Sequence, residues 1–300
     1  MSQSADQTVE QSIGQTMEKT DIFRKCGKIL AEVIFLVVCV LYLFPVFIVL
    51  VNSFKNRAEL YENILALPKA LNFEYYGKAM EEMNFLSAFS NSLIITVVSI
   101  AIIVVLSSMT AWMLVRTDNK LSKIIFMVFV STMLIPFQTL MMPLMQTMGL
   151  IRDHLHIPML NTLGGLIYMN VGFGASMAVF LYHGFVKSIP ISLEEAATID
   201  GCTKFGVFWR IVFPMLKPTT VTVMILDVIW IWNDYLLPSL VISSKALRTI
   251  PLSTASFFGQ FTIQWNMAMA GLMLTITPVI IFYLCAQKYI IKGVAAGAVK

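Results

Sequence analysis

Long runs of apolar residues alternate with short polar segments along the chain. A bilayer core about 30 Å thick needs roughly 20 apolar residues at the rise of an α-helix. The segments that meet this requirement, and that predict membrane-spanning helices, are 29–52, 88–115, 124–147, 163–186, 219–242 and 267–287. The fourth is rich in glycine, which lets neighbouring helices approach closely. The pattern therefore predicts an all-α membrane protein with six spans.

The polar segments complete the predicted organisation. Residues 1–28 contain few apolar side chains and predict a disordered polar tail, whereas 29–300 form the membrane domain. Within that domain we expect an outer loop at 53–87, which holds short helices at the membrane surface. A long hydrophilic loop occupies 188–218, and a short tail follows at 288–300.

The distribution of positive charge predicts the orientation. Most of the Lys and Arg residues fall in every second polar segment, beginning with the N-terminal one: Lys19, Arg24, Lys25, Lys28, Arg116, Lys120, Lys123, Lys187, Lys204, Arg210, Lys217, Lys288, Lys292 and Lys300. The intervening segments hold fewer: Lys55, Arg57, Lys69, Lys78, Arg152, Lys245 and Arg248. Because cytoplasmic segments carry the excess of Lys and Arg, both termini are predicted to be cytoplasmic. The first apolar run has no cleavage site of small residues after it, so we expect a retained span and not a signal peptide.

Composition supports the membrane assignment and narrows the chemistry. The chain is 58% hydrophobic and 13% charged, against about 25% charged residues in a typical soluble domain. Its net charge of +4 is too small to indicate nucleic-acid binding. The cysteines form no CxxC pair, and His154 and His156 in one outer loop do not make a metal site. We therefore predict no metal and no cofactor in this chain.

The hydrophilic loop 188–218 carries the clearest local pattern. Ser192 followed by Glu195 has the spacing of a capping box, which predicts a helix start. Ala196 and Ala197 are strong helix formers, and Gly201 stands where a helix would end with a left-handed residue.

A second short helix is predicted at 204–212, ended by Pro214 and Pro218. The two helices would form a compact helix–turn–helix on the cytoplasmic side. Its small alanine face and its glycine suit close docking into a groove of another protein.

This loop resembles the EAA loop of importer permeases of the ATP-binding cassette (ABC) superfamily. The family pattern is E-A-A, three residues, G, nine residues and then I-x-L-P. The matching residues here are Glu195, Ala196, Ala197, Gly201, Ile211 and Pro214, with Asp200 before the glycine as in many sugar permeases. The one departure is Phe213 where leucine is usual, an exchange of one apolar residue for another.

The resemblance extends over nearly the whole chain from about residue 30. It is closest to the carbohydrate permeases, the group that includes the smaller membrane subunit of the maltose transporter. The residues that carry it outside the loop are Pro45, Ser53-Phe54-Lys55, Asn91-Ser92, Pro136, Pro143, Trp232-Asn233-Asp234, Pro238 and the tails 287–293 and 297–300.

The resemblance implies a type I ABC importer permease fold, a place in the bacterial plasma membrane and a set of partners. Two permeases, usually different chains, pair around a translocation path, and an extracytoplasmic solute-binding protein delivers the sugar. Two cytoplasmic ATPase subunits grip the coupling (EAA) loops and use ATP and Mg²⁺. This chain has no GxxxxGK[ST] phosphate loop, so we do not expect it to be an enzyme.

The resemblance also implies roles within the loop. Glu195 would form a charge-assisted hydrogen bond with a basic group of the ATPase, although it could also cap its own helix. Ala196, Ala197 and Gly201 would set how closely the loop seats. Asp200 either takes part in docking or only favours the turn before the glycine.

Polar residues at membrane depth are candidates for the translocation path. Asn233 and Asp234 beside Trp232 combine hydrogen-bonding groups with an aromatic face, as a sugar site requires. The same pair could instead bond a neighbouring helix. Asp227 could face the same path, and Gln138 is a further candidate that helix packing explains equally well.

Other functions fit the sequence less well. A membrane enzyme would need a nucleophile–base pair or a metal cluster, and a secondary transporter usually carries inverted repeats or buried charge relays. An ABC permease for another solute is the alternative within the family.

Overall fold

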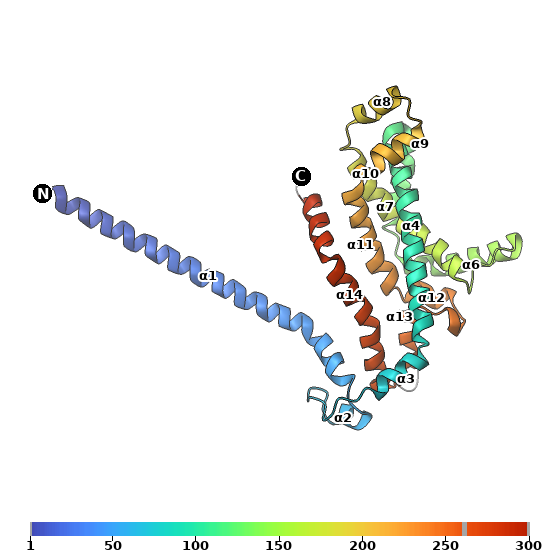
Figure 1. The fold of residues 1–300 in the computed structure, drawn as a ribbon, viewed down its shortest axis with the longest axis horizontal. Coiled ribbons are helices and arrows are strands. Elements are labelled where there is room, and N and C mark those ends of the chain that lie inside the picture. Colours follow the sequence, from blue (N-terminus) through green and yellow to red (C-terminus); the bar gives the residue numbers. More distant parts are fainter. Residues whose placement is uncertain (1, 260–262, 299–300) are drawn as a thin grey trace. The chain divides into compact units, whose positions relative to one another are not determined.

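The computed structural model describes residues 2–259 and 263–298. The chain divides into two compact units, 1–72 and 73–300, and each is described by itself (Figure 1). Within the described residues the structure is helical, apart from an isolated antiparallel bridge between Phe258 and Ile263.

The first unit consists of α1 (Ser2–Asn52) and α2 (Arg57–Glu62). Where the sequence predicted a disordered polar tail at 1–28, the structure extends α1 back to Ser2. No proline interrupts this polar stretch, and its Gln, Glu, Met and Lys residues are good helix formers.

A buried lysine organises the turn between α1 and α2. Lys55 is only 1% exposed, and its Nζ donates hydrogen bonds to the carbonyls of Asn63 at 2.9 Å and Ile64 at 3.1 Å. Asn52 at the end of α1 also donates to Ile64 O, at 3.0 Å. Burial lowers the pKa of Lys55 below the usual value for lysine.

The second unit begins with one short helix at an end of the bundle and continues with the long packed helices. The elements in order are α3 (Glu74–Glu82), α4 (Phe85–Thr117), α5 (Lys120–Thr132), α6 (Phe137–Leu155), α7 (Leu163–Val186), α8 (Ile191–Ile199), α9 (Lys204–Val207), the π-helix η1 (Phe208–Val212), α10 (Phe213–Met215), α11 (Lys217–Asn233), α12 (Leu236–Val241), the 3-10 helix η2 (Lys245–Leu247), α13 (Ile250–Thr254), the 3-10 helix η3 (Ala255–Phe257) and α14 (Trp265–Ala298). Within this unit α8 lies at the end opposite α3 (Figure 1).

Four helical stretches of the described chain are long and apolar enough to cross a membrane: 27–52, 85–117, 163–186 and 265–288. Two bent pairs of helices raise the number to six if each pair counts as one span. The pairs are α5 with α6, bent by 108°, and 204–215 with α11, bent by 74°.

The third and fifth predicted spans differ from the structure. Span 124–147 is not one straight helix, because Pro136 takes an extended conformation and α6 starts only after it. Span 219–242 is interrupted where α11 ends at Asn233, since Asp234 is extended and a new helix, α12, begins at Leu236. Hydropathy marks the apolar stretch and carries no information on these bends.

Small residues allow α4 and α7 to pack closely. Gly174 on α7 faces Ile103 on α4, and a Cβ at Gly174 would lie 2.6 Å from the Ile103 side chain. On α4 the buried positions include Ser107, Ser108 and Ala111. This contact forms the centre of the second unit, against which α5 and α11 also pack.

Candidate functional site

Helix α8 begins one residue before the predicted capping box. Pro190 is the N-cap residue and has an extended backbone, so the helix starts at Ile191. Ser192 and Glu195 therefore lie inside the helix, where both are exposed, and no side chain caps the helix start. The predicted capping box is wrong.

The other end of α8 has the predicted glycine. Gly201 has a φ of +86°, in the left-handed region. The amide of Gly201 donates to Thr198 O at 3.0 Å and that of Cys202 to Ala197 O at 2.9 Å. This pair of bonds is a Schellman motif, which satisfies carbonyls at the helix end and reverses the chain.

The second arm of the loop, which consists of α9 and the helical turns after it, does not end at Pro214 and Pro218. After α9 the backbone widens into the π-helix η1, in which the amide of Phe213 bonds back to Phe208 O. Pro214 follows at once and has no amide hydrogen to donate to the preceding turn, which fits the wider turn there. The helix continues as α10, and after the 74° bend as α11 with Pro218 in its first turn. The predicted end at Pro214 and Pro218 is a bend.

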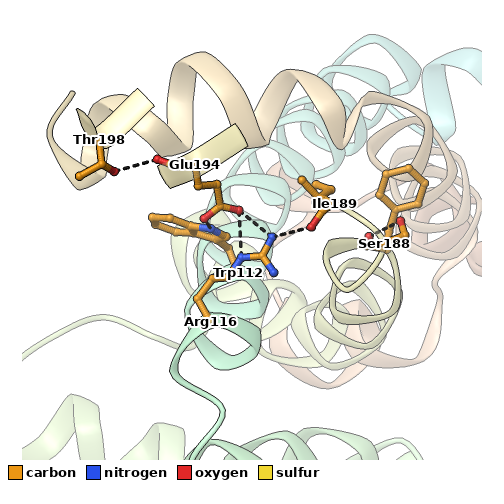
Figure 2. A network of polar contacts seen from close by, with 7 residues as sticks. Trp112, Arg116, Ser188, Ile189, Glu194 and Thr198 are labelled. Carbon is orange, nitrogen blue, oxygen red and sulfur yellow. Dashed lines mark hydrogen bonds and ion pairs between the residues drawn. The ribbon is translucent and has the colours of Figure 1, made fainter. Parts of the chain in front are cut away.

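Glu194, and not Glu195, connects α8 to the membrane helices (Figure 2). Glu194 Oε2 accepts a hydrogen bond from Trp112 Nε1 at 2.9 Å, and Oε1 accepts from Arg116 Nε at 2.9 Å and Nη2 at 2.7 Å. Arg116 Nη2 also donates to Ile189 O at 3.0 Å. The side chains of Arg116 and Glu194 are 18% and 10% exposed. Such partly buried, charge-assisted bonds are stronger than those of exposed ion pairs.

An aromatic contact joins the second arm of the loop to the same place. The ring of Trp112 packs on that of Phe208, with 5.5 Å between centroids. Phe208 is fully buried and in turn contacts Trp209 and Phe213. The end of α4 is therefore held by both arms of the loop.

Sequence reasoning missed Trp112, Arg116 and Glu194. The available signal was weak: Glu194 and Ala197 share one face of α8 at i, i+3 spacing, and Arg116 stands in the last turn of a span. Both Glu194 and Ala197 are in fact buried.

The opposite face of α8 is exposed and partly apolar. It presents Glu195 and Ala196 together with Leu193 and Ile199, the last of which is 86% exposed. In α9, Phe205 is 63% exposed. Asp200 and Gly201 are exposed at the turn, Ile211 is half-buried and Pro214 is exposed.

A cavity of about 740 Å³ lies between α5, α6, α7 and α11. Asp227 on α11 lines it and is 5% exposed, and its Oδ2 has no hydrogen-bond partner among the described residues. Trp230, Tyr168 and Phe173 contribute aromatic walls. A buried carboxylate oxygen without a partner is costly, so a ligand hydroxyl that donates to it would be favoured.

The other predicted path residues lie elsewhere. Trp232 packs edge-on against Phe89 at 5.7 Å. Asn233 donates to Ile229 O on its own helix, and Asp234 Oδ1 accepts from the amides of Leu236 and Leu237 at the start of α12. These are the local bonds of a helix break.

Gln138 is exposed in the first turn of α6, beside the cavity-lining Phe137, and does not itself line the cavity. Of the predicted path residues, Asp227 lines it.

The chain matches a known protein family and is similar to known permeases. Residues 79–296 match the family described as "Binding-protein-dependent transport system inner membrane component". The chain is similar to the probable starch degradation products transport system permease protein AmyC of Thermoanaerobacterium thermosulfurigenes, with 51% identity over 88% of this chain and 94% of the relative. It is 33% identical to the melibiose/raffinose/stachyose import permease protein MelC of Bacillus subtilis, over 88% and 94% of the two chains.

A solved structure shows the same fold. A chain in the crystal structure of a bacterial ABC transporter involved in the import of the acidic polysaccharide alginate superposes with a TM-score of 0.74. The alignment covers 88% of this chain and 96% of that one, at 19% sequence identity. On the family match and the identity to its relatives, this chain belongs to the inner membrane components of binding-protein-dependent transport systems.

Proposed function

We propose that this chain is one of two permease subunits of an ATP-driven importer for neutral oligosaccharides of the kind released from starch. As an inner membrane component it is a permease and has no ATPase activity of its own. The substrate class is supported by the relative that is 51% identical, described as a transporter of starch degradation products, and by the sugar permeases at lower identity.

The observation that carries the proposal is the two-sided geometry of α8. One face is fixed to α4 through Glu194, while the other presents Glu195, Leu193 and Ile199 to solvent. An exposed carboxylate among exposed apolar side chains, on a helix fixed from behind, suits docking to a partner. We assign that partner as an ATPase subunit that supplies a basic group for Glu195 and an apolar pocket for Ile199.

The end of the second unit that holds α8 is assigned to the cytoplasm, with both termini on that side. The ends of α4 and α7, the start of α5 and the second arm of the loop lie there (Figure 1). These elements carry Arg116, Lys120, Lys123, Lys187, Lys204, Arg210 and Lys217. Such an excess of positive charge marks the cytoplasmic side.

The remaining partners follow from the transport cycle. A second permease, a different chain, covers the exposed apolar faces of the membrane helices, and an extracytoplasmic binding protein delivers the sugar. ATP binding closes the two ATPase subunits, which moves the docked α8 helices together and opens the path outward. Hydrolysis resets the path.

The cavity at Asp227 is our candidate for this subunit's part of the path. Asp227 Oδ2 can accept a hydrogen bond from a sugar hydroxyl, and Trp230 can stack on the apolar face of a sugar ring. One carboxylate among apolar and aromatic groups favours a neutral ligand over an anionic one.

Reconstitution tests the proposal. The tagged chain is purified from membranes with whatever binds it, placed in proteoliposomes with the binding protein, and assayed for uptake of labelled maltotriose. We expect an ATPase and a second permease to co-purify, and uptake to require ATP and the binding protein. Uptake by the chain without an ATPase would instead support a secondary transporter, and uptake of a different solute would contradict the substrate class.

A further inference from the structure

Helix α4 is a long rod of continuous helix. Its 33 residues, Phe85–Thr117, contain neither glycine nor proline, whereas every other described helix of 18 residues or more contains at least one of them. Glycine and proline are the usual sites of helix kinks. At about 1.5 Å per residue, α4 is roughly 50 Å long, enough to connect the two sides of a membrane.

One end of this rod is bound to α8. Trp112 and Arg116 lie in the last two turns of α4, and their side chains donate hydrogen bonds to the loop, to Glu194 and Ile189 (Figure 2). Of the nine residues of α8, only Glu194 and Ala197 are buried. The carboxylate of Glu194 is therefore the main polar connection by which α8 can push or pull α4.

The other end of the rod is bound to the segment 245–254, which spans η2 and α13. Asn91 Nδ2 donates to Ala246 O at 2.9 Å and to Arg248 O at 3.1 Å. Ser92 Oγ accepts from the amide of Ile250 at 2.9 Å. Asn91 and Ser92 are both buried. These bonds fix a segment on the far side of the bundle to the first turns of α4.

We propose that α4 transmits the displacement of α8 to the segment 245–254, and that Glu194 is the positioning residue through which α8 holds α4. The inference rests on the proposed function, since it takes α8 to be the helix that the ATPase moves. A continuous helix that is bonded at both ends to short segments can move those segments together. ATP binding on one side thereby rearranges the surface that meets the binding protein on the other.

The test measures the reactivity of a residue in the segment 245–254 while nucleotide acts, through the ATPase, at the end of α4 that contacts α8. In a complete transporter whose native cysteines in this chain are replaced, a single cysteine is placed at Ala246, an exposed position. The rate at which it reacts with a membrane-impermeant maleimide is measured with and without a non-hydrolysable ATP analogue. We expect nucleotide to change the rate in the parent protein. Glu194→Gln should reduce that change by about fivefold or more, the lower range of allosteric coupling, while the ATPase still co-purifies.

Further variants separate transmission from folding. The double variant Glu194→Ala/Arg116→Ala leaves no unpaired charge, and should lose the nucleotide-dependent change as Glu194→Gln does. Asn91→Ala, at the far end, should have the same effect, and combining it with Glu194→Gln should add little because the two act in series. Lys123→Ala is the matched control, because it breaks an exposed pair with Asp118 at the same end of α4.

The outcomes distinguish a failure of transmission through α4 from a failure of the proposed function. If the Glu194 variants bind the ATPase and keep the full nucleotide-dependent change at residue 246, α4 does not transmit through Glu194 and this inference is wrong. If the parent protein itself binds no ATPase, the proposed function fails, and the inference fails with it.

Discussion

The carboxylate of Glu194 lies 2.7 Å from Nη2 of Arg116, a residue 78 positions earlier in the chain. The next residue, Glu195, is exposed. Two adjacent glutamates, which project about 100° apart around the helix, thus have different surroundings: Glu194 is buried against the membrane helices and Glu195 is exposed to solvent. On this arrangement rests our proposal that α8 connects the bundle to a partner.

Gly165 is predicted not to tolerate a side chain, because the backbone of Met159 lies too close to it. A Cβ there would lie 1.8 Å from Met159 O, a backbone atom that cannot move aside alone. Gly165→Ala should therefore displace the segment before α7, at a cost of about 3 kcal/mol or more. Thermal unfolding of the purified protein, followed by size-exclusion chromatography, measures the loss. Gly164→Ala is the control, since no atom lies within 4 Å of its Cβ; equal stability of the two variants would contradict the packing.

Substitution of Gly201 is expected to act through the backbone conformation alone. Its φ of +86° disfavours any residue with a Cβ, yet no atom lies within 4 Å of that Cβ. Gly201→Ala should cost about 1–2 kcal/mol locally and fray the end of α8, which limited proteolysis of the loop would detect. Gly201→Asn should be milder, because asparagine tolerates the left-handed region. If alanine were no worse than asparagine, the Schellman turn would not be needed.

We expect substitution of Asp227 to change substrate affinity alone. Asp227→Asn replaces the carboxyl group of the cavity with an amide, so the KM for sugar uptake should rise about fivefold, as expected for losing a hydrogen bond worth about 1 kcal/mol. Co-purification of the ATPase should be unchanged. Asp153→Asn, which alters an exposed carboxylate paired with Arg152, is the control. An unchanged KM in Asp227→Asn would remove this cavity from the path.

We expect the turn after α1 to depend on one ammonium group, that of Lys55. Lys55→Met would leave the carbonyls of Asn63 and Ile64 without their donor, at a cost of about 1–3 kcal/mol. Faster proteolysis within 53–72 is the expected readout. Lys69→Met, which breaks only an exposed pair with Glu62, should leave the rate unchanged. Similar rates in both variants would show that the buried bonds do not hold the turn.

The sequence predicted those features that depend on local or averaged properties. Apolar stretches long enough to cross a bilayer were found by hydropathy, and the left-handed residue at Gly201 was found because glycine adopts that conformation most readily. The cavity-lining position of Asp227 was suggested by its depth within a predicted span.

What the sequence did not predict depends on tertiary contacts. The choice between Glu194 and Glu195 follows from which face of α8 meets α4, and neither residue type nor spacing decides that. The local bonds of Asn233 and Asp234 follow from the end of α11 in the middle of an apolar stretch. Pro214 allowed a π-helix and a bend where a stop was expected, because the tertiary structure continues the helix on both sides.

We infer that the exposed face of α8 binds an ATPase subunit while its buried face holds the bundle. The decisive experiment is co-purification with Glu195→Arg, with the wild type and Glu194→Gln alongside. We predict that Glu195→Arg loses the ATPase and retains the second permease, whereas the other two retain both. Full recovery of the ATPase with Glu195→Arg would contradict the claim.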